Sequence, residues 1–94
     1  MPQRTVVVGS TSGLHARPAA LFVKAATAQA TPVRLRVGER ESVDARSILG
    51  VLALRVKQGT EVTLEADGEN AEAALDVLAG LLARNLDEED EQHA

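Results

Sequence analysis

The side chains best suited to chemistry in this sequence are His15 and Arg17, in the stretch Gly-Leu-His-Ala-Arg-Pro-Ala at residues 13–19. A neutral imidazole is a nucleophile, and free histidine is mainly neutral at neutral pH. A guanidinium two residues further along the chain can bind an anion through several hydrogen bonds. The pair is therefore suited to accepting a phosphoryl group on the histidine ring and binding it there.

This pair is predicted to lie at the start of a helix that begins near Ala16. Apolar residues recur at helical spacing from there, and Pro18 fits a first turn, where its missing N–H would have no partner. A helix start carries a partial positive charge, which attracts anions and disfavours a protonated ring. His15 is thus expected at or next to the N-cap. The expected buried face consists of Ala19, Phe22, Val23 and Ala26.

The stretch lacks the partners that a hydrolase or a self-sufficient transferase needs. No Asp or Glu lies within ten residues of His15, and cysteine is absent, so we expect neither a metal nor a cofactor. His93 lies in an acidic stretch and is expected to play no part. A nucleophile without an acid, base or metal indicates a carrier that other proteins load and unload. Taken by itself, a histidine at a helix start is more often a cap or a surface residue.

Composition and charge narrow the class of protein. The 94 residues have room for one small domain with a surface site. The single aromatic residue, Phe22, argues against binding of single-stranded nucleic acid, which relies on stacked aromatics. The sequence has neither a signal-peptide core nor an apolar run long enough to span a bilayer, so we expect a cytoplasmic protein that binds no membrane.

Charge is distributed unevenly, although the net value is −4. Residues 1–60 contain nine Lys or Arg and three acidic residues, whereas residues 61–94 contain eleven acidic residues and one arginine. Five of those acids lie in residues 87–94, which we expect to form a solvated, disordered tail. The part that carries His15 is basic and favours anionic ligands or acidic partner surfaces.

The remaining pattern predicts four strands and two more helices. Alternating apolar and polar residues predict strands at Thr5–Gly9, at 33–37, through Val43 after a turn at Gly38, and at Thr60–Ala66. A second helix is expected from its N-cap Ser47 to a stop at Gly59, with Ile48, Val51 and Leu52 at helical spacing. A third helix is expected after its cap Asn70, with a face of Ala71, Ala74, Leu75, Leu78, Leu81 and Leu82.

The order β-α-β-β-α-β-α, with strands that are polar on one face, predicts a sheet covered by helices on one side only. The fold class is therefore a two-layer α+β domain, over residues 1–86. Neither an internal repeat nor a second domain is visible in the sequence.

The segments GLHARPA, RSILGVLAL and GTEVTLEADGENAEAAL, in this order of elements, resemble the HPr family, the histidine-containing phosphocarrier proteins of the bacterial phosphoenolpyruvate-dependent sugar phosphotransferase system. The similarity covers about residues 3–86. It implies an open-faced β-sandwich with a four-stranded antiparallel sheet in the order 1-4-2-3, and a monomer. The resemblance also implies that His15 accepts a phosphoryl group through Nδ1 from phosphorylated enzyme I and donates it to IIA domains of sugar permeases. Arg17 would bind the phosphate, and the protein would be a stoichiometric carrier rather than an enzyme.

Ser47 matches a position that is phosphorylated for regulation in many family members. The resemblance therefore implies an HPr kinase and a transcriptional regulator as further partners. As an N-cap alone, a serine at this position is already explained.

The resemblance further implies a partner-docking surface beside His15, formed by Leu14, Ile48, Leu49, Leu52 and Arg55. Not all apolar residues of so short a helix can face inward, so exposure is expected first for Leu49 and then for Leu52. Ordinary core packing is expected for Ile48, Val51 and Leu54. Family members commonly carry a small residue, often glycine, where this chain has Arg55, which adds charge and bulk near that surface.

Two other functions remain open at this point. An HPr-like regulatory module would bind a transcription factor or an enzyme and use phosphorylation only as a signal. A small-molecule-binding α+β domain of the same topology would have His15 merely as a helix cap. The retained histidine favours the carrier over the first alternative, and Arg17 favours it over the second.

Overall fold

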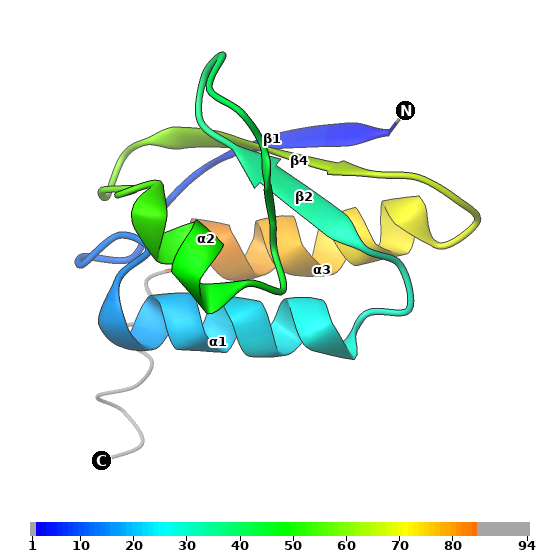
Figure 1. The fold of residues 1–94 in the computed structure, drawn as a ribbon, viewed down its shortest axis with the longest axis horizontal. Helices are drawn as coiled ribbons and strands as arrows, with labels where there is room; N and C mark the ends of the chain where they lie inside the picture. The colour runs from blue at the N-terminus through cyan, green and yellow to red at the C-terminus, as the bar shows by residue number, and fades with distance from the viewer. Residues whose placement is uncertain (1, 85–94) are drawn as a thin grey trace.

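The computed structural model describes residues 2–84 as an antiparallel sheet of four strands packed against three helices. Figure 1 shows the sheet as one layer and the helices as the other. The elements are β1 (Gln3–Val7), α1 (Ala16–Ala28), β2 (Val33–Arg36), β3 (Val43–Asp44), α2 (Ile48–Ala53), β4 (Glu61–Ala66) and α3 (Ala71–Ala83). The predicted order and fold class are confirmed. The predicted tail at 87–94 and His93 lie outside the described residues.

The sheet has the order β1-β4-β2-β3, as the family resemblance implied. β4 pairs with β1 on one side and with β2 on the other, and every pair is antiparallel. Along β4, Val62 and Leu64 are fully buried against the helices, whereas Glu61 is exposed. The alternation read from the sequence therefore gives the correct inward face.

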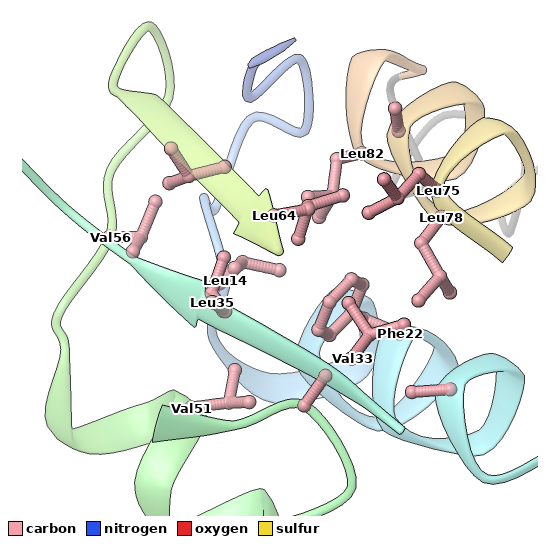
Figure 2. Packing of buried hydrophobic residues seen from close by; sticks show 14 of the residues in the cluster. Leu14, Phe22, Val33, Leu35, Val51, Val56, Leu64, Leu75, Leu78 and Leu82 are labelled. Carbon is pink, nitrogen blue, oxygen red and sulfur yellow. The ribbon is translucent and has the colours of Figure 1, made fainter. Parts of the chain in front are cut away.

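The core fills the space between the sheet and the helices, as Figure 2 shows. Phe22 of α1 is fully buried there, together with Leu75 and Leu78 of α3. The predicted inward face of α1 is confirmed for Ala19, Phe22 and Ala26, which are at most 1% exposed, and Val23 packs against this core. No helix within residues 2–84 is long and apolar enough to cross a membrane.

Strand β1 begins and ends two residues earlier than the predicted Thr5–Gly9. Arg4 is accommodated in the strand because its guanidinium forms ion pairs with two carboxylates of α3, Glu72 at 3.0 Å and Asp76. The side-chain hydrogen bond to Asp76 raises the pKa of Arg4. Gly9 instead leaves the sheet, since its N–H donates to Leu82 O at 2.9 Å at the end of α3.

One predicted helix end is wrong, and one predicted cap lacks its side-chain bond. α2 ends at Ala53 and not at Gly59, which has φ +85 and precedes β4. Asn70 is the N-cap residue of α3, but its side chain makes no capping hydrogen bond. Strand β3 is also short, with only Val43 and Asp44 in the ladder. For α2 and β3 the local pattern located the element and misjudged its end, where tertiary contacts decide.

Gly13 brings two distant segments together. It has φ +67, and a Cβ placed on it would lie 2.1 Å from Val56 O. The next residue, Leu14, donates its N–H to the same carbonyl at 3.0 Å. Only glycine fits this position, because both the backbone conformation and the close approach exclude a side chain.

Gly13→Ala should lower the free energy of unfolding by about 2–4 kcal/mol, because strain at a positive φ adds to a clash with backbone atoms. Urea denaturation followed by circular dichroism measures the change. The control is Gly80→Ala in α3, where an added Cβ meets nothing within 4 Å. This variant should gain up to about 1 kcal/mol from helix propensity. Equal stabilities of the two variants would contradict the role given to Gly13.

Candidate functional site

His15 is the N-cap residue of α1, as predicted, with an extended backbone at φ −138 and ψ 158. Its side chain is exposed and makes no capping hydrogen bond. The interpretation of this histidine as a helix cap therefore accounts for its backbone but not for its ring. The imidazole is left available to another molecule.

The backbone before His15 is held firmly even though the ring is exposed. A turn closes from Gly13 N–H to Ser10 O at 2.9 Å, and Leu14 N–H bonds Val56 O at 3.0 Å. The Leu14 side chain is only 1% exposed and belongs to the core. The expectation that Leu14 forms part of an exposed docking surface is therefore wrong. Its role is to anchor the loop, since a leucine in the core fixes the residue that follows it.

An open hollow of about 440 Å³ lies at His15. Two segments form it, one before α1 and one that runs from α2 to the loop beyond it. Its lining residues are Ser12, Leu14, His15, Leu52, Arg55, Val56 and Lys57. The hollow is shallow and open to solvent, so it suits a small group carried on the ring rather than an enclosed metabolite.

The charged residues known to line this hollow are positive. Among the described residues that line it, Arg55 and Lys57 are cationic and none is acidic. Arg17 lies exposed in the first turn of α1, two residues after His15, and is not among the lining residues. In the sequence, Arg17 stands out because it is the cation closest to His15 along the chain. The sequence did not point to Lys57, although the alternation of exposed Arg55, buried Val56 and exposed Lys57 was a usable signal.

The apolar surface of α2 adjoins the hollow. Leu49 is 78% exposed, as expected, and Leu52 is partly buried against the core while it also lines the hollow. Val51 and Leu54 are core residues, also as expected, but Ile48 is 39% exposed. The expectation of core packing for Ile48 is wrong because α2 has only six residues, fewer than two turns, and Val51 is the one of them that is buried.

Ser47 is the N-cap of α2, as predicted. Its Oγ accepts a hydrogen bond from Gly50 N–H at 3.1 Å. A Cβ on Gly50 would lie 3.3 Å from this Oγ and 3.3 Å from Val43 Cβ, so a small residue suits the position. This capping bond accounts for a serine here in structural terms.

Arg55 has φ +54 and is the only residue other than glycine with a positive φ within residues 2–84. It follows the C-cap Leu54, at the position where a helix commonly ends on a left-handed glycine. Two hydrogen bonds hold this helix end: Arg55 N–H donates to Leu52 O at 3.2 Å, and the Arg40 guanidinium donates to Leu54 O at 3.1 Å. The backbone thus explains why a glycine would suit this position, and why α2 ends here.

The described part of the chain offers no group of three or more His, Asp or Glu side chains that could hold a metal ion.

Comparison with known proteins gives concordant results. Residues 2–84 match the PTS-HPr family model, described as "PTS HPr component phosphorylation site". The chain is 49% identical over 88 residues to the phosphocarrier protein HPr of Streptomyces coelicolor, covering 94% of this chain and 95% of that protein. It is 47% identical over 86 residues to the HPr-like protein Crh of Bacillus subtilis, covering 92% and 100%.

Solved structures agree with the sequence comparison. The crystal structure of a phosphocarrier protein HPr from Bacillus anthracis superposes with a TM-score of 0.81 at 36% sequence identity. The superposition covers 86% of this chain and 95% of that one. The similarity thus extends over the sheet, the helices and the segments that form the hollow.

Arg55→Gly should raise the free energy of unfolding by about 0.5–1 kcal/mol, because relief of left-handed strain exceeds the added chain entropy of glycine. Thermal and urea denaturation measure the change. Arg55→Ala is the matched control, because it removes the same charge and keeps a Cβ at positive φ. If the glycine and alanine variants are equally stable, the backbone strain assigned to Arg55 is absent.

Proposed function

Because the chain belongs to the HPr family and is a phosphocarrier of the phosphotransferase system, we propose that His15 is the residue that carries the phosphoryl group. The observation that carries the proposal is an exposed imidazole on a firmly held backbone, at the start of a thirteen-residue helix. The ring makes no capping bond, and it borders a hollow whose lining, among residues 2–84, includes cations and no acid.

The transfer needs only the ring of His15 and the donor. The lone pair of a ring nitrogen, Nδ1 by the family resemblance, forms the N–P bond while the bond from phosphorus to the donor breaks. Donation to an acceptor is the reverse, with the ring as leaving group, so water takes no part. An exposed ring in an open hollow supports this chemistry, because two different partners must reach it in turn.

Binding of the carried phosphoryl group rests on positive charge near the ring. The start of α1 contributes the partial charge of its dipole and first-turn N–H groups. Arg17 adds a full charge in that turn and is our proposed phosphate-binding residue. Arg55 and Lys57 add positive charge along the lining of the hollow.

Docking of partners is proposed on the exposed face of α2 and its C-terminal end. Ile48 and Leu49 are followed by Leu52 at helical spacing, and Leu52 reaches the hollow. This places apolar contact area directly beside His15, with Arg55 at its edge. We propose that phosphorylated enzyme I and IIA domains of sugar permeases use this surface in turn, with the protein acting as a stoichiometric carrier.

Ser47 is our proposed regulatory site. It lies at the N-cap of α2, directly before Ile48 and Leu49, so a phosphate there would change the charge at the edge of the docking surface. A dedicated HPr kinase would add the phosphate, and a transcriptional regulator would recognise it. A cytoplasmic location and a monomeric state complete the proposal.

The wild-type chain should become phosphorylated when it is incubated with phosphoenolpyruvate and enzyme I, whereas His15→Ala should not. The phosphate should be acid-labile and alkali-stable, as expected of a bond to a ring nitrogen, and autoradiography of labelled protein measures both properties. Label that persists on the alanine variant, or no label on either protein, would exclude His15 as the carrier residue.

Leu49→Asp should lower the second-order rate of phosphoryl transfer from enzyme I by about tenfold, because it removes a central apolar contact and adds a charge to the interface. Stability should change by less than about 0.5 kcal/mol, since the side chain is exposed. Val77→Asp is the matched control: Val77 is 50% exposed on α3, outside the proposed surface, and its change should leave the rate unaltered. Equal rates for the two variants would place docking elsewhere.

A further inference from the structure

The cations that share the hollow with His15 are not those that the sequence singled out. Arg55 and Lys57 line it, on the segment that faces the histidine loop. We propose that Arg55, assisted by Lys57, binds the phosphoryl group carried by His15 from the side opposite α1. The proposal rests on His15 as the carrier residue and adds a second, cationic wall to that site.

The backbone places both side chains toward the hollow. Val56 is 4% exposed and belongs to the core, so it anchors the segment that carries Arg55 and Lys57. Both are exposed, and both line the hollow. The Val56 carbonyl accepts the N–H of Leu14, the residue before His15. That hydrogen bond fixes the two segments against each other, so the cations and the imidazole face the same space.

The Arg55 guanidinium is available to a ligand in a way that most arginines of this chain are not. This guanidinium group forms neither a hydrogen bond nor an ion pair with any residue in the range 2–84. Five other arginines use their guanidinium groups to bond carboxylates, carbonyls or a hydroxyl; they are Arg4, Arg34, Arg36, Arg40 and Arg46. A planar donor with no protein partner, beside a nucleophile, suits a phosphoryl group.

The conformation of Arg55 supports the same role. The four other residues with a positive φ in the described range are all glycine. An arginine at such a position is strained, and strain of this kind is concentrated at functional sites. Here the strained residue lines the same hollow as His15. The carbonyl oxygen of its neighbour Leu54 accepts a hydrogen bond from the Arg40 guanidinium at 3.1 Å.

A phosphoryl group is favoured over a carboxylate of a partner protein as the ligand of Arg55. The hollow contains the histidine ring itself, so a group attached to that ring lies within the same space. An acidic partner residue would need to enter beside the phosphoryl group and would be repelled by it.

The test uses inorganic phosphate as the probe and the full-length, unphosphorylated chain as the protein. Chemical shifts of the His15 ring and of the Arg55 Nε–H group should move together in a titration followed by NMR. Arg55→Gly should weaken phosphate binding by about three- to tenfold, as expected for loss of a charge-assisted hydrogen bond in an exposed site. Arg55→Lys should restore part of the affinity. Lys24→Gln, an exposed cation on α1 outside the hollow, should leave it unchanged.

A second measurement follows the phosphorylated protein without any partner. Arg55→Gly should change the hydrolysis half-life of the phosphohistidine by severalfold, since it removes a contact to the phosphoryl group that is transferred from the ring to water. Equal phosphate affinity and equal half-life in wild type and variant would overturn the proposal. If transfer from enzyme I is slowed at the same time, Arg55 contacts the partner instead.

These results separate the proposal from the function on which it rests. If the wild-type chain is not phosphorylated at His15, the carrier role fails, and the phosphate titration still decides whether Arg55 forms an anion site. If His15 is phosphorylated and Arg55→Gly behaves as wild type, only the present proposal fails. Unfolding is distinguished directly, because this variant is expected to be more stable than wild type.

Discussion

One main-chain hydrogen bond, from Leu14 N–H to Val56 O at 3.0 Å, determines the geometry of the candidate functional site. It joins residues 42 positions apart in the chain and brings the His15 loop against the segment after α2. The approach is close enough to require glycine at position 13. The sheet and helices supply the framework, but this contact brings the exposed imidazole and the cations Arg55 and Lys57 to the same open hollow.

The end of α2 depends on a second local constraint, the left-handed backbone of Arg55. By stopping the helix after six residues, it turns the chain so that Val56 enters the core and Lys57 returns to the surface. The same short helix leaves Leu49 exposed. The proposed docking surface and the proposed phosphate-binding cations therefore both depend on this helix end, where the Arg40 guanidinium from the β2–β3 connection donates to Leu54 O.

The sequence predicts the order of elements and their inward faces well, because periodicity reports which side of a strand or helix is buried. It also locates His15, since a helix start is readable from Pro18 and from the apolar spacing that follows. It does not predict the hollow, the burial of Leu14 or the part played by Lys57. These features depend on contacts between segments that are far apart in the chain, and a local sequence pattern contains no information about such contacts.

A carrier needs a bound phosphoryl group that is held and also released, and the arrangement around His15 fits both needs. The backbone on either side of the ring is fixed by hydrogen bonds and by a buried leucine, so little ordering is required when a partner arrives. The cations, in contrast, are exposed to water, where each contact to an anion is worth only about 0.2–1 kcal/mol. A buried guanidinium would hold the group more tightly and so oppose donation. Exposed cations on a rigid frame therefore suit reversible transfer better than an enclosed pocket would.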